Sequence, residues 1–116
     1  MGNPGNDRRI DNIEFAVSDI ARSREFYGKA FGWTFTDYGP TYIAFNEGLD
    51  GGFHTDEAEA IQQSLVILYA HDLESVEAKV KAAGGTVTKP IFSFPGGRRF
   101  HFTDPAGNEL AVWSQG

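Results

Sequence analysis

The stretch NIEFAVSDIARSREFYGKAFG (residues 12–32) has a counterpart 53 positions later, LVILYAHDLESVEAKVKAAGG (residues 65–85). In each copy an apolar strand leads to an aspartate, then to apolar residues at helical spacing, and finally to glycine. Asp19 and Asp72 stand where helix N-caps belong, and Gly32 and Gly85 stand where the helices are expected to stop. We therefore interpret the chain as two copies of one structural unit.

Each predicted helix is followed by short β-rich segments separated by turn residues. We expect residues Pro90 to Gly97 to form a loop in the second copy that the first copy lacks. A four-stranded half exposes an apolar face, so two halves must pair to bury it, either within one chain or between two chains. The pattern predicts an α+β fold in which two tandem β-α-β-β-β modules form a curved sheet around a cleft. The predicted strands after the helices are residues 33–37, 41–46, 51–54, 86–89, 99–103 and 109–114.

The same pattern predicts the domain organisation of the 116-residue chain. Residues 1–9 form an N-terminal tail and residues 10–55 the first module. The acidic, glutamine-containing stretch 56–63 is a linker, and residues 64–116 form the second module. At this length we expect one structural domain overall.

Composition excludes several classes of protein. Ten Lys and Arg residues against sixteen Asp and Glu residues give a net charge of −6, which argues against a nucleic-acid partner and favours a neutral or cationic ligand. No apolar run approaches the roughly 20 residues that span a membrane, so no membrane partner is expected. The absence of cysteine removes thiolate chemistry and cysteine-bound zinc, and favours a cytoplasmic location.

Several short motifs occur in a specific order along the chain. They are Val17-Ser18-Asp19, Phe26-Tyr27, Phe31-Gly32-Trp33, Ala83-Gly84-Gly85 and Phe102-Thr103-Asp104-Pro105-Ala106-Gly107-Asn108. Together they resemble the vicinal oxygen chelate superfamily, which includes glyoxalase I, the bleomycin-resistance proteins and the extradiol dioxygenases. The resemblance extends from Ile10 to Trp113. It implies paired β-α-β-β-β modules, a homodimer, and in catalytic members a divalent metal held by four inner-face ligands.

The chain departs from that metal-binding pattern. The resemblance places ligands at positions that here hold Asn12, Leu65 and Ala111, and a fourth near Gly52 to His54. Divalent ions prefer carboxylate oxygen or imidazole nitrogen, so three of these positions are unsuited to a metal. We therefore expect no metal or other cofactor. A replacement divalent-metal site built from Glu14, His54, His101 and Glu109 is chemically allowed but unsupported.

Alternation along the strands selects the candidate site residues. Glu14 shares the face of Asn12, and Glu109 shares the face of Ala111, so these two carboxylates are candidate acid–base groups. His101 lies between Phe100 and Phe102, which belong to the opposite face, and is the third catalytic candidate. The candidate substrate-binding residues are Asn12, Tyr42, His54, Leu65, Tyr69, Ala111 and Trp113.

Three classes of function remain open at this level. The first is a metal-free member of the superfamily that binds a small organic molecule. The second is a lyase or isomerase similar to glyoxalase I, or a dioxygenase, in which Glu14, Glu109 and His101 act as acid–base groups or replacement metal ligands. The third, a pure interaction module, predicts a filled cleft.

Overall fold

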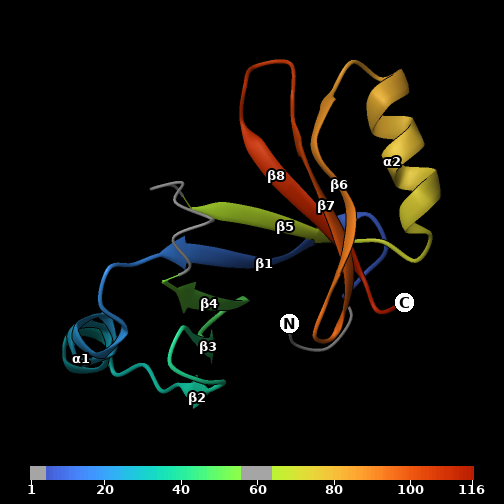
Figure 1. The fold of residues 1–116 in the computed structure, drawn as a ribbon. Coiled ribbons are helices and arrows are strands. Elements are labelled where there is room, and N and C mark those ends of the chain that lie inside the picture. Colours follow the sequence, from blue (N-terminus) through green and yellow to red (C-terminus); the bar gives the residue numbers. More distant parts are fainter. Residues whose placement is uncertain (1–4, 56–63) are drawn as a thin grey trace. The chain divides into compact units, whose positions relative to one another are not determined.

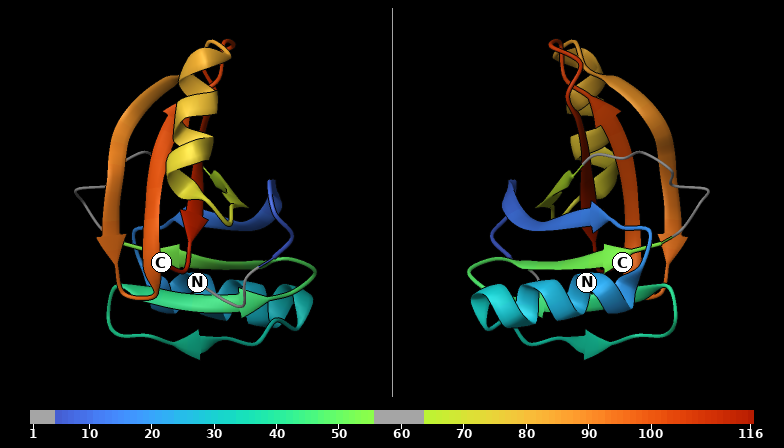
Figure 2. Two further views of the ribbon diagram at one scale, coloured as in Figure 1. Left: turned by 90° about the vertical axis from the view of Figure 1, so that its right-hand side faces the viewer. Right: turned by 90° about the vertical axis from the view of Figure 1, so that its left-hand side faces the viewer.

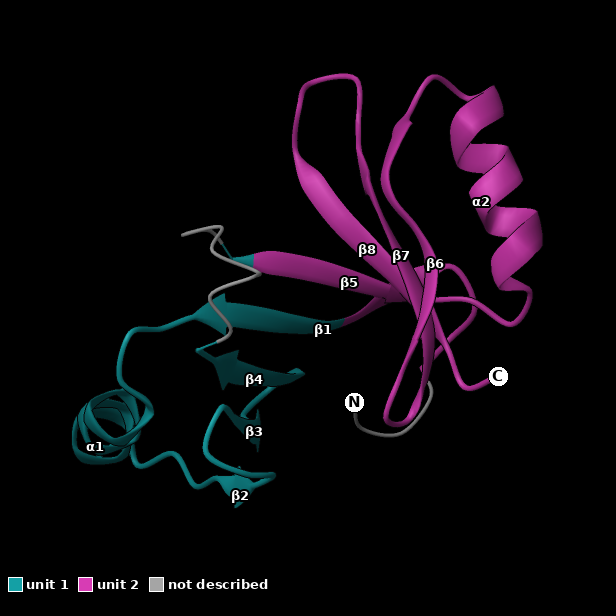
Figure 3. Ribbon diagram, viewed as in Figure 1, with its two compact units in different colours: residues 1–2, 12–64 teal, residues 3–11, 65–116 magenta. Residues whose placement is uncertain are grey.

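The computed structural model describes residues 5–55 and 64–116, which form eight strands and two helices. It divides into two compact units (Figure 3). Unit 1 contains residues 12–55 and 64, and unit 2 contains residues 5–11 and 65–116. The predicted linker 56–63 and the first four residues of the predicted tail lie outside the described residues, and the predicted module boundaries stay a prediction.

Unit 1 is a four-stranded sheet with one helix (Figure 1). Its elements are β1 (Arg9–Ala16), which begins in unit 2, α1 (Ile20–Phe31), β2 (Thr36–Asp37), β3 (Tyr42–Asn46) and β4 (Asp50–His54). The strands lie in the order β2-β3-β4-β1, with β4 parallel to β1 and the other neighbours antiparallel. The return of β4 beside β1 completes the first β-α-β-β-β module.

Helix α1 begins and ends where the sequence predicts. The Asp19 side chain accepts a hydrogen bond from the backbone N–H of Arg22 at 3.1 Å, and Gly32 closes the helix with φ of 74°. Tyr27 packs on the core formed by Ile43, Phe45 and Phe53. Its neighbour Phe26 lies about 100° away around the helix and is 58% exposed, and its ring meets that of Tyr27 edge-on with a centroid distance of 5.0 Å.

Unit 2 repeats this arrangement. Its elements are β5 (Leu65–Tyr69), α2 (Leu73–Ala82), β6 (Thr86–Phe94), β7 (Gly97–Thr103) and β8 (Glu109–Ser114). The strands lie in the order β5-β8-β7-β6, with β8 parallel to β5. Figure 2 shows α2 lying along the strands, where it covers a core of Ala70, Leu73, Phe100 and Val112.

Two details of the second module differ from the sequence-based expectation. Residues Pro90 to Gly97 do not form a loop, because β6 continues to Phe94 and turns tightly into β7. The ladder with β7 is irregular between Lys89 and Phe92, which accommodates the missing N–H of Pro90. Helix α2 ends at Ala82 with Ala83 as its C-cap, two positions before the predicted Gly85, and the glycine with positive φ (103°) is Gly84.

Helix α2 begins after Asp72, as the sequence predicts, and the Asp72 side chain accepts a hydrogen bond from the backbone N–H of Ser75 at 3.1 Å. The predicted α+β fold with two tandem β-α-β-β-β modules is thus confirmed. The predicted cleft stays a prediction. Within the described part of the chain, neither helix has the length and hydropathy needed to cross a membrane.

Candidate functional site

Strand register defines a polar face on the first module, opposite to helix α1. Asn12 pairs with Asp50 across β1 and β4, and Glu14 pairs with Gly52. Residues paired in this way project from the same face of a sheet. Because Ile13, Phe15 and Phe53 pack toward the helix, the face bearing Asn12 and Glu14 is directed away from it. The predicted face-sharing of Asn12 and Glu14 is therefore present.

Two polar side chains of this face are buried. Asn12 is 1% exposed and Glu14 is 6% exposed. Both take part in further interactions. Burial of an amide and a carboxylate is costly unless polar partners compensate. The two buried polar side chains therefore distinguish this face from a purely apolar packing surface.

Tyr42 reaches across the same face toward Gly52. In register, Tyr42 pairs with His54, and Ala44 pairs with Gly52. The Tyr42 hydroxyl nevertheless contacts the position that a Cβ on residue 52 would take. Because Gly52 has no side chain, the side chain of Tyr42 can extend over it. Gly52 is also the residue that pairs with Glu14 on β1.

A pocket with a volume of about 270 Å³ lies on this face, entirely within unit 1. We call it the first-module pocket. Its walls come from the β2–β3 hairpin and from the Asn12–Asp50 end of β1 and β4. The residues that line it are Asn12, Thr34, Phe35, Thr36, Tyr38, Tyr42, Ala44, Phe45, Asn46, Asp50 and Gly51.

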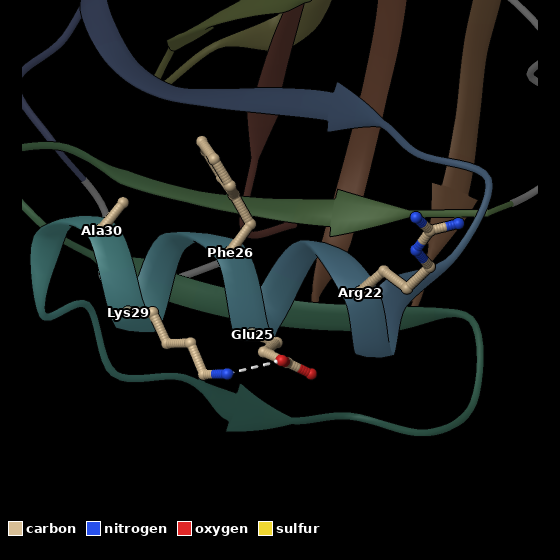
Figure 4. A pocket seen from close by; sticks show the side chains of 5 residues that line it. All are labelled: Arg22, Glu25, Phe26, Lys29 and Ala30. Carbon is tan, nitrogen blue, oxygen red and sulfur yellow. Dashed lines mark hydrogen bonds and ion pairs between the residues drawn. The ribbon is translucent and has the colours of Figure 1, made fainter.

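A second hollow, with a volume of about 470 Å³, runs along helix α1 (Figure 4). Arg22, Glu25, Phe26, Lys29 and Ala30 line it, and Lys29 donates a hydrogen bond to Glu25 at 2.8 Å. All five residues come from one exposed helix, and this hollow contains none of the predicted site residues. We therefore place the candidate site in the smaller first-module pocket.

The second module has an equivalent face, opposite to α2. Ala111 pairs with Ile67 on one side and with His101 on the other, and Trp113 pairs with Tyr69. Leu65 precedes Ile67 by two positions and therefore projects from the same face. Phe100 and Phe102 pack against the α2 side of the sheet, as the sequence predicts for the neighbours of His101.

A histidine–carboxylate pair lies on this second face. Nδ1 of His101 is 3.1 Å from Oε2 of Glu109, and only 1% of the His101 side chain is exposed. Phe92 stacks on the imidazole ring with a centroid distance of 5.8 Å. Imidazole beside a carboxylate is an arrangement that can transfer protons, and it unites two of the three predicted catalytic residues.

The two predicted aromatic binding residues of this module are buried. Trp113 is 1% exposed and Tyr69 is 6% exposed, with their ring centroids 5.2 Å apart. The indole Nε1 of Trp113 donates a hydrogen bond to Oδ2 of Asp11 at 2.7 Å. Both rings therefore serve as packed side chains in the present structure.

The strand register also locates the fourth family metal position. Glu14 and Ile67 are 53 positions apart and occupy the same place in the two modules. Since Ala111 pairs with Ile67 and Gly52 pairs with Glu14, Gly52 is the first-module counterpart of Ala111.

The donor chemistry at these positions does not fit a divalent ion. They carry Asn12, Gly52, Leu65 and Ala111, of which only the asparagine has a side-chain oxygen. Among residues 5–55 and 64–116, no group of three or more His, Asp or Glu side chains is arranged to hold a metal ion.

The predicted site residues are thus divided between the units. Asn12 and Tyr42 line the first-module pocket, and Glu14 and His54 lie on the same sheet face. Leu65, Tyr69, His101, Glu109, Ala111 and Trp113 belong to the second module's face. The residues' roles in catalysis or binding stay predictions.

Other residues of the first-module pocket are not among those predicted from the sequence. The most informative are Tyr38, Asn46 and Asp50. The Gly39-Pro40 turn signals that Tyr38 and Tyr42 face each other across a hairpin. No sequence signal places Asp50 next to Asn12, because that contact depends on the parallel pairing of two separated strands.

The structure consists of a duplicated β-α-β-β-β module with a pocket on the polar face of the first copy. Comparison with known proteins identifies the class of protein to which this arrangement belongs. The family model described as the glyoxalase/bleomycin resistance protein/dioxygenase superfamily matches residues 9–112. The chain therefore belongs to this superfamily, as the motifs indicate. No curated protein matches the chain.

Solved structures share the fold at low sequence identity. An NAD-dependent benzaldehyde dehydrogenase structure from Legionella pneumophila is 17% identical, with a TM-score of 0.75 over 90% of this chain and 98% of that chain. Methylmalonyl-CoA epimerase from Mycobacterium tuberculosis is 11% identical, with a TM-score of 0.72 over 92% and 87%. The Mn(II)-bound glyoxalase from Novosphingobium aromaticivorans is 20% identical, with a TM-score of 0.67 over 94% and 39%. At these identities the likeness concerns the fold alone.

Proposed function

We propose that this member of the superfamily binds a small organic molecule and works without the family's usual metal. The observation that carries the proposal is the set of side chains at the four family ligand positions, namely Asn12, Gly52, Leu65 and Ala111. Glycine, leucine and alanine offer no donor atom to a metal. Ligand recognition then depends on the protein's own polar and aromatic groups.

The first-module pocket supports the binding part of this proposal. Its volume of about 270 Å³ suits a small molecule or one end of a larger one. Buried Asn12 and the phenol of Tyr42 supply directional polar groups in its lining. The net charge of −6 disfavours a nucleic-acid ligand.

Metal analysis of the purified protein tests the first half of the proposal. We expect far less than one divalent ion per chain, both as purified and after incubation with Mn²⁺, Ni²⁺ or Zn²⁺ followed by dialysis. A stoichiometric ion that is lost on substituting Glu14, His54, His101 or Glu109 would overturn metal independence and favour the replacement site.

A fragment screen followed by amide NMR tests the second half. We expect bound fragments to shift the resonances of residues on the polar face of the first module, including Asn12, Ala44 and Asp50. A screen in which no fragment shifts this face would contradict the proposed binding function.

The buried pair of His101 and Glu109 supports a second candidate function, a lyase or isomerase that moves a proton on a carbon acid. In such a reaction a base takes a proton from carbon and an acid returns one. Incubation with methylmalonyl-CoA or a hemithioacetal in D₂O would then incorporate deuterium at that carbon. We expect His101→Asn to abolish the exchange. Without any exchange in the native protein, the binding function is the better account.

We further propose that the protein is a cytoplasmic homodimer. Cytoplasmic residence is supported by a chain without cysteine. Dimer formation is supported by the family resemblance.

A further inference from the structure

We propose that the first-module pocket binds an organic cation, with an amine or quaternary ammonium group held between the rings of Tyr38 and Tyr42 and the carboxylate of Asp50. This inference deepens the proposed binding function and depends on it. It names the chemical class of the ligand and assigns binding roles to two residues, Tyr38 and Asp50, that are not among the predicted site residues.

The two tyrosines form an aromatic corner set by backbone structure. The N–H of Tyr38 donates to the carbonyl of Tyr42 at 3.1 Å, which closes the turn through Gly39 and Pro40. Gly39 has φ of 115°, a conformation that glycine adopts readily. The two ring centroids are 6.2 Å apart and the ring planes are inclined by 51°. Inclined aromatic faces of this kind attract a cation through their quadrupoles.

A carboxylate lies at the other end of the pocket lining. Asp50 begins β4 and pairs with Asn46 on one side and with Asn12 on the other. Nδ2 of Asn46 donates to Oδ1 of Asp50 at 2.6 Å. This hydrogen bond orients the carboxylate without neutralising its charge.

The space between the two ends is bounded by small side chains. Thr36 pairs with Ala44 in the β2–β3 ladder, and both line the pocket. Neither side chain is large enough to bridge from the tyrosines to Asp50. The ligand head group therefore has room beside them, within the 270 Å³ of the pocket.

The charge of the pocket selects a cation. Among the residues that line it, none is Lys, Arg or His, and Asp50 is the acidic one. Arg24 is basic and approaches the ring of Phe35, but it is ion-paired with Asp37. Asp37 follows Thr36 in β2 and so projects from the opposite face. An anionic ligand would thus meet uncompensated negative charge, whereas a cation gains a carboxylate and two aromatic faces.

The test compares choline with its neutral isostere 3,3-dimethyl-1-butanol on the full chain by amide NMR titration. We expect choline to bind at least about tenfold more tightly and to shift the amides of Tyr38, Tyr42 and Asp50. Asp50→Asn retains the Asn46 hydrogen bond and removes the charge. Tyr38→Leu removes one ring from a side chain that is 67% exposed, so folding is preserved. Each change should weaken choline binding about three- to thirtyfold, the range expected for cation–π and ion-pair contacts.

Glu47→Gln is the matched control. Glu47 lies on the β3–β4 turn outside the pocket lining and accepts a hydrogen bond from the Thr34 N–H at 3.2 Å, which glutamine can also accept. The Glu47→Gln substitution removes one negative charge, as Asp50→Asn does, and should leave the affinity for choline unchanged. Equal binding of choline and its isostere, or an unchanged affinity in Asp50→Asn, would overturn the proposal. If neutral fragments still shift this face, the cation assignment alone fails; if no compound does, the proposed binding function fails with it.

Discussion

The hydroxyl of Tyr42 lies over Gly52, in contact with the place that a β-carbon at position 52 would occupy. A β-carbon there would also lie 2.8 Å from the carbonyl oxygen of Ile43 on the neighbouring strand. Position 52 is the first-module counterpart of a family metal ligand, so a ligand side chain and the present Tyr42 conformation exclude each other. The present conformation of Tyr42 thus depends on the absence of a side chain at position 52.

This contact predicts that Gly52→Ala destabilises the protein. We expect a loss of about 1–3 kcal/mol in the free energy of unfolding, as for other overpacked cores, measured by urea denaturation. In a Tyr42→Ala background the same substitution should cost less, because one of the two obstacles is gone and only the Ile43 carbonyl remains. Equal costs in both backgrounds would show that the tyrosine does not occupy this space.

The hydrogen bond from Trp113 to Asp11 predicts a second stability effect. Trp113 is 1% exposed, so removing its acceptor leaves a buried N–H without a partner. We expect Asp11→Ala to lower the free energy of unfolding by about 1–3 kcal/mol. Urea denaturation monitored by tryptophan fluorescence measures this loss. Asp11→Asn keeps an acceptor oxygen and should cost less than half as much. A similar loss in both variants would assign the effect to charge instead of the hydrogen bond.

The turn between β7 and β8 predicts a pH dependence. Hydrogen bonds from the side chain and backbone of Asn108, together with the backbone N–H of Ala106, hold the pKa of Asp104 below its ordinary value of 3.8. A carboxylate with a depressed native pKa stabilises the fold above its unfolded pKa, and this stabilisation is lost as the pH falls through the native pKa. At neutral pH the native protein should therefore have a higher melting temperature than Asp104→Asn.

The difference in melting temperature between the native protein and Asp104→Asn should narrow as the pH is lowered below 3.8. Thermal unfolding of both proteins across the acidic range measures it. Asparagine resembles the protonated aspartic acid, so the two curves should converge. A difference that stays constant with pH would mean that the charge of Asp104 contributes nothing.

The proposed dimer predicts a molecular mass of twice 12.7 kDa by light scattering. The mass should hold over a tenfold dilution if the association is stable. A mass of one chain at high concentration would contradict the dimer.

Much of the secondary structure was predictable because its signals are local. Asp19 and Asp72 cap the two helices through side-chain hydrogen bonds to residues three positions later. The alternation around His101 correctly assigned Phe100 and Phe102 to the helix-covered face. Such features depend on backbone geometry within a few residues, which sequence spacing reflects directly.

The candidate site was only partly predictable, since its residues meet through long-range pairing. Asn12 and Tyr42 were predicted as binding residues from a family ligand position and from aromatic character, but Asp50 joins them because β4 returns parallel to β1. Pro90 was expected to end a strand, yet β6 pairs with a single neighbour among the described strands and tolerates the proline at an irregularity.

The sequence by itself determined the duplicated β-α-β-β-β module, the helix caps and the face on which each strand residue lies, because these follow from local periodicity. Only the tertiary structure decided that Tyr42 extends over Gly52, that His101 meets Glu109, and that Asp50 lines the same pocket as Tyr38 and Tyr42. The physical reason is that these contacts join residues on different strands, and their distances depend on strand register and packing instead of on spacing along the chain.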